Sequence, residues 1–140
     1  MRIFPSLIQL IILGTGPYHS EWLLLGTIYR AAIATYLNLS FPCLSPLHNP
    51  HSDILFSNLQ IALQSPQLVK FLLWSLVVAG VAAIHRGKAT RHWVERSLEE
   101  MRRTVGSSGP LKAGKVLRAY WERGIEGWDE CFQRPYVFVV

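Results

Sequence analysis

The sequence predicts an all-α protein, an array of about five helices. Half of the 140 residues are hydrophobic and 16% are charged, which provides enough apolar side chains for one buried core at this length. Apolar residues also recur at helical spacing in several segments that end at glycine or proline. The C-terminal tail of residues 135–140 is rich in aromatic and β-branched residues. Because a lone strand is not stable by itself, this tail is expected to be extended.

The first long helix is expected over residues 21–39. This stretch contains strong helix formers and no proline, and Gly26 is its only residue that disfavours a helix. Its apolar residues lie on most faces of the helix. A helix with that pattern belongs in a core. Residues 40–50 are predicted to form a loop, because each of three prolines removes a backbone donor there: Pro42, Pro46 and Pro50.

Two serines mark the expected starts of the next two helices. Ser52 is expected to cap a helix over residues 53–64, whose first turn is acidic. Ser65 followed by Pro66 predicts another helix that runs to Ile84, since a capping hydroxyl before proline is a typical helix start.

Two amphipathic helices are expected in the C-terminal half. In residues 89–105 the apolar positions are spaced at i, i+4, i+7 and i+11, with charged side chains between them. Glu99 and Arg103 are placed for an ion pair on this helix. A turn rich in glycine and serine, residues 106–110, separates it from a helix over residues 111–123.

The charge distribution argues against a nucleic-acid surface. The net charge is +5, but the residues up to Ile84 hold three basic and two acidic side chains, and the rest hold eleven and seven. Mixed charge on helices is typical of a solvated face with i,i+4 pairs. Any DNA binding by this chain alone is therefore expected to be weak, independent of sequence and reduced by salt.

The best candidate for a metal site is the proline-rich loop, where four potential ligands lie close together: Cys43, His48, His51 and Asp53. Their spacing matches no standard zinc signature, and the second cysteine, Cys131, is distant in sequence. The sequence also lacks a glycine-rich phosphate loop and a Gly-x-Ser-x-Gly elbow. We therefore predict no metal-binding, cofactor-binding or catalytic residue, and no enzymatic activity.

The low charge density of the N-terminal half makes a small two-span membrane protein the alternative. Residues 22–41 and 68–84 would be its spans, with the charged C-terminal half in the cytosol. Arg30 lies near the middle of the first span, which is unfavourable for insertion. The apolar N-terminal segment of residues 1–20 has the outline of a secretory signal, but a single arginine and Pro5 make it a poor one.

Five tryptophans are spread over the chain rather than gathered in one loop: Trp22, Trp74, Trp93, Trp121 and Trp128. We expect them to anchor the core. A third functional alternative is a ligand-sensing module with a pocket among Trp74, Trp93 and Tyr36.

Four groups of residues follow one another in a particular order. They are Tyr29-Arg30-Ala31 with Tyr36-Leu37, the run from Leu72 to Gly80, the start Arg91-His92-Trp93-Val94, and Trp121 with Trp128. This order resembles the C-terminal part of the fungal-specific transcription factor domain of Zn2Cys6 binuclear-cluster regulators. Ser75 stands where that family usually has proline. The resemblance covers about residues 22–128.

The resemblance implies an all-helical regulatory domain over residues 21–134, part of a larger helical domain that acts in transcription through protein contacts. The implied partners are related full-length regulators, and the implied location is the nucleus or the cytoplasm. The six cysteines of the zinc cluster are absent from the sequence, so specific DNA binding by this chain alone is not expected. If the chain is a truncated copy, it is expected to expose the apolar faces of residues 22–39 and 71–84.

Overall fold

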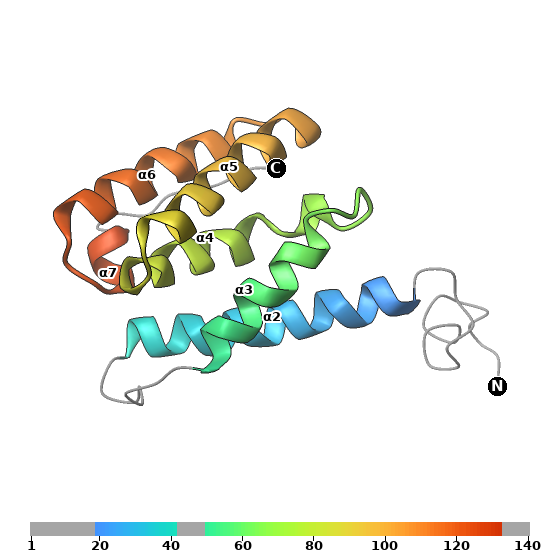
Figure 1. The fold of residues 1–140 in the computed structure, drawn as a ribbon, viewed down its shortest axis with the longest axis horizontal. Helices are drawn as coiled ribbons and strands as arrows, with labels where there is room; N and C mark the ends of the chain where they lie inside the picture. Colours follow the sequence, from blue (N-terminus) through green and yellow to red (C-terminus); the bar gives the residue numbers. More distant parts are fainter. Residues whose placement is uncertain (1–18, 42–49, 133–140) are drawn as a thin grey trace.

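The computed structural model describes residues 19–41 and 50–132 (Figure 1). Within these residues the chain forms six α-helices and no strand, and five of the helices have seven residues or more. In chain order they are α2 (His19–Ser40), α3 (Pro50–Ala62), α4 (Leu73–Ala82), α5 (Lys88–Val105), α6 (Gly109–Arg123) and the short α7 (Trp128–Cys131). The prediction of an all-α fold is confirmed.

Some features of the sequence analysis lie outside the described residues. They are residues 1–18 of the apolar N-terminal segment, Cys43 and His48 of the proline-rich loop, and the tail of residues 135–140.

The helix α4 lies at the centre of the fold. It packs between one layer formed by α2 and α3 and a second layer formed by α5 and α6, and it contacts all four (Figure 1). Nine of its ten residues are buried, and Trp74 is the exception. The sequence of α4 carries no charge and is almost entirely apolar, which suits a helix that is covered on every side.

The prediction of one helix from Pro66 to about Ile84 is wrong at its start, whereas its end agrees to within two residues. Residues 66–68 form turns, the 3-10 helix η2 (Val69–Phe71) follows, and α4 begins only at Leu73. After Ala82 the chain tightens into a second 3-10 helix, η3 (Ala83–His85). The central α-helix is therefore about half as long as the sequence pattern indicates.

Contacts with α2 explain why the helix begins late. The Tyr29 hydroxyl of α2 donates a hydrogen bond of 2.6 Å to the Phe71 carbonyl oxygen, which directs this acceptor toward α2 instead of along a continuous helix. Ser65 does not cap a helix, because its hydroxyl donates to the Glu21 carboxylate of α2. The sequence pattern assigned the Phe71 carbonyl and the Ser65 hydroxyl to helix formation. In the structure both groups hold the connection between α3 and α4 against α2.

The predicted cap at Ser52 is also wrong. The helix α3 begins at Pro50, so Ser52 lies inside its first turn, and proline is common at the start of a helix. The Ser52 hydroxyl accepts a hydrogen bond of 3.1 Å from the Arg86 guanidinium. Arg86 also pairs with Asp53 and lies over the Phe56 ring, 4.4 Å from the ring centroid. This cluster ties α3 to the residue that follows η3.

Two glycines end α5 and α6. Gly106 and Gly124 have φ angles of 76° and 75°, in the left-handed region, and each donates its N–H to the carbonyl oxygen four residues earlier. This is a common arrangement at helix C-termini, and glycine adopts it without a steric penalty. Three apolar positions of α5 are buried as their spacing predicts: Val94, Leu98 and Met101.

Ser75 is the third residue of α4, and its position is compatible with proline. The N–H groups of the first helical turn have no partner within the helix, so proline at this position removes no helical hydrogen bond. The Ser75 hydroxyl is buried and has no hydrogen-bond partner among the described residues.

Candidate functional site

The tryptophans differ in burial, so the expectation that all five anchor the core is only partly met. Trp121 is 8% exposed, and its indole N–H donates a hydrogen bond of 2.8 Å to the Gly80 carbonyl oxygen of α4. Trp74 is 40% exposed and lies beside the Tyr36 ring of α2, 6.1 Å between ring centroids. The other three are partly buried against the core: Trp22, Trp93 and Trp128. Trp74 is thus a surface residue, contrary to the prediction.

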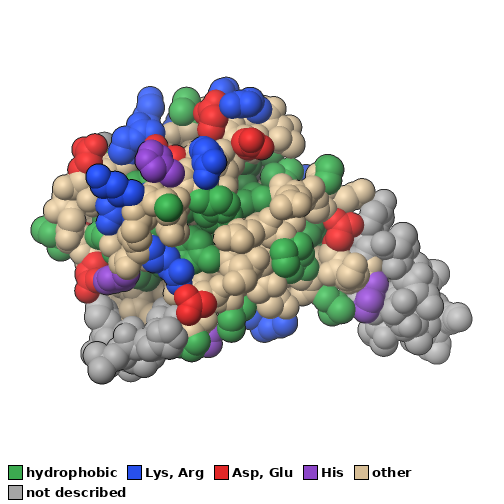
Figure 2. Space-filling view, viewed as in Figure 1, with side chains coloured by type: hydrophobic (Ala, Val, Ile, Leu, Met, Phe, Trp, Pro, Cys, Tyr) green, Lys and Arg blue, Asp and Glu red, His purple; other side chains and the backbone are tan. Residues whose placement is uncertain are grey.

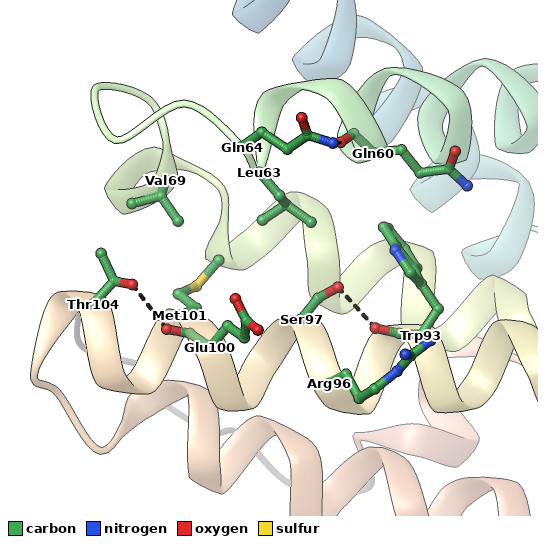
Figure 3. A pocket seen from close by; sticks show the side chains of 10 residues that line it. All are labelled: Gln60, Leu63, Gln64, Val69, Trp93, Arg96, Ser97, Glu100, Met101 and Thr104. Carbon is green, nitrogen blue, oxygen red and sulfur yellow. Dashed lines mark hydrogen bonds between the residues drawn. The ribbon is translucent and has the colours of Figure 1, made fainter.

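A groove of about 290 Å³ lies between α3, η2 and α5 (Figure 3). Leu63 enters it from the α3 side, and Trp93 and Met101 line it from α5. The rim is polar and consists of Gln60, Gln64, Arg96, Ser97, Glu100 and Thr104. Trp74 and Tyr36 are not among the lining residues, so the structure does not bring together the three aromatic side chains of the sensing-pocket alternative.

The chemistry of this groove does not define a ligand. The Ser97 and Thr104 hydroxyls donate to the carbonyl oxygens of Trp93 and Glu100, at 2.7 and 2.9 Å. Among the described residues, no side-chain atom that lines the groove is both buried and without a hydrogen-bond partner. The volume is also near the lower limit of ligand pockets, about 300 Å³. We therefore assign no small molecule to it.

The metal-site candidates are not supported as a cluster. Only His51 and Asp53 of the four lie in the described part of the chain, in the first turn of α3, and Asp53 pairs with Arg86. The described residues contain no group of three or more His, Cys, Asp or Glu arranged to hold a metal ion.

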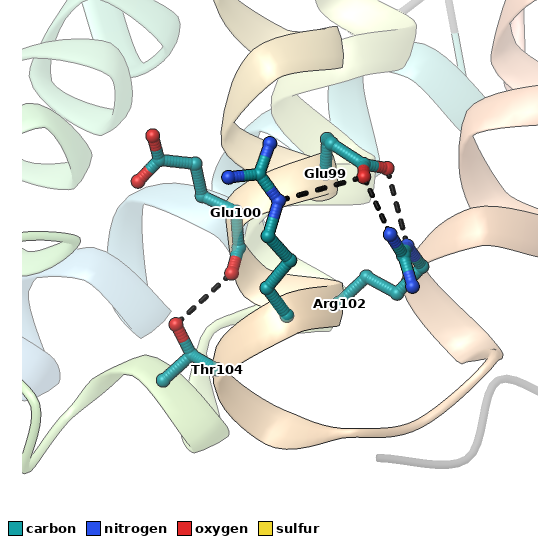
Figure 4. A network of polar contacts seen from close by, with 5 residues as sticks. Glu99, Glu100, Arg102 and Thr104 are labelled. Carbon is teal, nitrogen blue, oxygen red and sulfur yellow. Dashed lines mark hydrogen bonds and ion pairs between the residues drawn. The ribbon is translucent and has the colours of Figure 1, made fainter.

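The outer surface of α5 carries a network of charged side chains (Figure 4). The Glu99 carboxylate contacts Arg102 at 2.6 Å and Arg103 at 3.7 Å, so the predicted pair of Glu99 with Arg103 forms, and a shorter one lies beside it. The hydrogen bonds from Arg102 lower the pKa of Glu99 below its usual value. Exposed pairs of this kind contribute little to stability, which agrees with a solvated helix face.

The outward face of α2 carries exposed apolar side chains. We call Leu23, Ile33, Leu37 and Phe41 the outer stripe of α2; their exposed fractions are 55%, 51%, 45% and 51%. The last three are spaced four residues apart; Ile33 and Leu37 lie on one side of the helix, and Phe41 is the residue that follows it. The opposite side is buried against the core through Leu25, Ile28, Ala31, Ala32 and Thr35. Apolar side chains of residues 22–39 are thus exposed on one side of the helix, whereas in residues 71–84 the exposed large apolar side chains are Phe71 and Trp74.

The two candidate membrane spans correspond to α2 and to η2 with α4. At ten residues, α4 is shorter than the roughly 20 that a helical span needs. Across residues 19–41 and 50–132, no helix combines the length and hydropathy of a membrane span.

The stability of the fold is expected to fall at alkaline pH because two groups that lose a proton there are buried. Burial raises the pKa of the Cys131 thiol and of the Tyr120 hydroxyl to about 12, whereas these groups titrate near 8.5 and 10 in an unfolded chain. The contribution of these two groups to the free energy of unfolding is fully present below about pH 8.5. It is lost as the pH rises toward 12, because the unfolded state loses its protons first and is stabilised relative to the folded state. Urea unfolding is expected to show a free energy that falls steadily between pH 8 and pH 10.5. A flat profile over that range would contradict the burial of both groups.

Comparisons with known proteins point to one family. The model of the fungal specific transcription factor domain matches residues 7–134. A protein named "Phomenoic acid biosynthesis cluster-specific transcriptional regulator", from Leptosphaeria maculans, is 40% identical over 129 residues, which are 86% of this chain and 25% of that protein. The chain therefore spans about a quarter of the length of this relative. No solved structure matches the chain.

Proposed function

Because the chain belongs to the family of fungal-specific transcription factor domains, we propose that it regulates transcription by binding another protein through the outer stripe of α2. The family comprises transcription regulators, not enzymes. The nucleus is the compartment in which this function operates. The partner that we propose is a related full-length regulator, of which the Leptosphaeria maculans protein is an example.

The observation that carries this proposal is the apolar character of α2 on both sides. A helix that is apolar all round is typically covered all round, yet Ile33, Leu37 and Phe41 are about half exposed. Arg30 is the one charged residue in the helix after its first turn. Exposed apolar side chains that share one helix face mark protein contacts, and a partner that covers the outer stripe would bury them.

DNA recognition is assigned to the partner in this proposal. The sequence has two cysteines, whereas the zinc cluster of the full-length regulators uses six. We therefore propose that these 140 residues supply a protein contact and do not themselves select a promoter.

Co-purification with the full-length Leptosphaeria maculans relative tests the proposal. The tagged 140-residue chain is expected to retain the relative, and the double variant Ile33→Lys/Leu37→Lys is expected to lose most of it. The matched control is Ile125→Lys between α6 and α7, which is also exposed (56%) but does not belong to the outer stripe. Thermal unfolding of both variants should resemble that of the unaltered chain, because all three positions are exposed.

Two outcomes would overturn the proposal. One is a complex that the double variant retains as well as the control does. The other is a chain that does not bind the relative at all, or that binds only a second copy of itself through the outer stripe.

A further inference from the structure

The net charge of the chain resides on two adjacent helices. The helices α5 and α6 carry nine basic and four acidic side chains, and all other residues together carry five of each. The net charge of +5 is therefore the net charge of this pair of helices. Figure 2 shows charged side chains gathered over the region where α5 and α6 lie, whereas few occur over α2 and α3.

Two adjoining hollows run between α5 and α6, with volumes of about 230 and 330 Å³. They share His92, Glu95 and Arg118, and an ion pair of 2.8 Å joins Glu95 to Arg118 across the two helices. We call the two hollows together the α5–α6 groove. Its apolar lining consists of Leu98, Pro110, Leu111 and Trp121.

Positive charge in this groove is not fully compensated. Lys88, Arg96 and Lys115 line it and make no ion pair within the described part of the chain. Arg91 donates from one guanidinium nitrogen to the Ile84 carbonyl oxygen at 3.1 Å, but its Nε is buried and has no acceptor among the described residues. A buried donor without a partner is costly. Among the described residues, the lining holds four basic side chains without an ion pair and one such acid, Glu122, so a negatively charged ligand suits the groove best.

We propose that the α5–α6 groove binds an acidic protein segment with interspersed apolar side chains. Its carboxylates would meet Lys88, Arg91 and Lys115, and its apolar side chains would rest against Leu98 and Leu111. Alternation of acidic and apolar residues is typical of disordered activation segments. This binding site is separate from the outer stripe of α2, so it goes beyond the function proposed above and does not depend on it.

A protein segment fits the groove better than a nucleic acid does. Three acids line the groove among the basic side chains, Glu95, Glu99 and Glu122, and they would repel a continuous row of phosphates. Single-stranded nucleic acids also need exposed aromatic rings for base stacking, whereas the aromatic residue here, Trp121, is buried. Backbone N–H groups of a peptide, in contrast, supply donors for these carboxylates.

Fluorescence anisotropy with a labelled synthetic peptide tests the proposal on the 140-residue chain. The probe is a 20-residue peptide of alternating Asp or Glu with Leu or Phe, and a second peptide carries Asn and Gln in place of the acids. The chain is expected to bind the acidic peptide and to bind the neutral one at least about tenfold more weakly, with the affinity for the acidic peptide reduced by salt.

Charge reversals at exposed positions locate the site. The variant Lys88→Glu/Lys115→Glu is expected to weaken binding of the acidic peptide about tenfold or more. The matched control, Lys70→Glu/Lys112→Glu, makes the same change in net charge at exposed lysines that do not line the groove, and it should weaken binding less than about threefold. Thermal unfolding of both variants checks that the fold is retained.

Four results would overturn the proposal: no binding of the acidic peptide, equal binding of the neutral peptide, equal weakening by the two double variants, or tighter binding of a 20-base-pair DNA duplex than of the acidic peptide. The variant Ile33→Lys/Leu37→Lys leaves the groove unaltered and should bind the peptide as well as the unaltered chain does. Failure at the groove is thus distinguishable from failure of the α2 proposal.

Discussion

Replacing Ile28 by alanine is expected to lower the free energy of unfolding by about 2 to 5 kcal/mol. Ile28 is fully buried on the inner side of α2, the helix that packs against both α3 and α4. Truncation removes its apolar contacts and leaves a cavity that the neighbouring helices fill only in part. Against a typical total stability of about 5 to 15 kcal/mol, this loss is large, and urea unfolding followed by circular dichroism measures it.

The same substitution at Ile33 is the matched control. Ile33 lies on the same helix but belongs to the outer stripe and is 51% exposed, so Ile33→Ala is expected to change stability by no more than about 0.5 kcal/mol. Equal losses at the two positions would show that the outer stripe is covered within the chain itself. That result would remove the observation on which the proposed protein contact rests.

Periodic, locally determined helices were predictable from the sequence. In α5 the buried positions Val94, Leu98 and Met101 repeat at helical spacing, and Gly106 follows where the helix ends. Such signals depend only on residues within one or two turns of each other. The boundaries of α2, α5 and α6 therefore agree with the prediction to within two residues.

The errors in the fold arise from contacts between residues that are distant in sequence. The late start of α4 depends on Tyr29 and Phe71, which are 42 positions apart. Ser52 pairs with Arg86, 34 positions away, and its supposed role as a cap followed from treating Pro50 only as a loop residue. A local pattern contains no information on which of these partners will be close in space.

The two candidate sites also differ in whether a local sequence pattern predicts them. Apolar residues on most faces of residues 21–39 already indicated a helix that needs covering on both sides, and the outer stripe is the face left exposed. The α5–α6 groove was not predictable, because it forms between two helices and no pattern within either helix shows which side chains line it. The excess of basic side chains becomes a site only when Lys88 and Lys115 line one groove.

Replacing Gly80 by alanine is expected to destabilise the fold by about 1 to 3 kcal/mol. A β-carbon at Gly80 would lie 2.5 Å from Leu117 Cδ1 and 3.0 Å from Cδ2, so the Leu117 side chain of α6, which is fully buried, would have to shift within the packed core. Glycine normally lowers helix stability by about 1 kcal/mol relative to alanine, so a loss on substitution would show that the close contact of α4 with α6 outweighs helix propensity. Thermal or urea unfolding measures the change.

Gly114→Ala on α6 provides the control with the opposite sign. A β-carbon there would lie 3.9 Å from Leu98 Cδ1, an ordinary contact, so only helix propensity acts and stability is expected to rise by about 0.5 to 1 kcal/mol. The double variant Gly80→Ala/Leu117→Ala separates clash from propensity. If the clash is the cause, adding Gly80→Ala to the Leu117→Ala background will raise stability rather than lower it, because the methyl group then fills the space that the leucine left. A further loss in that background would mean that Gly80 is required for its backbone alone, and that α4 and α6 are not held together by the contact described here.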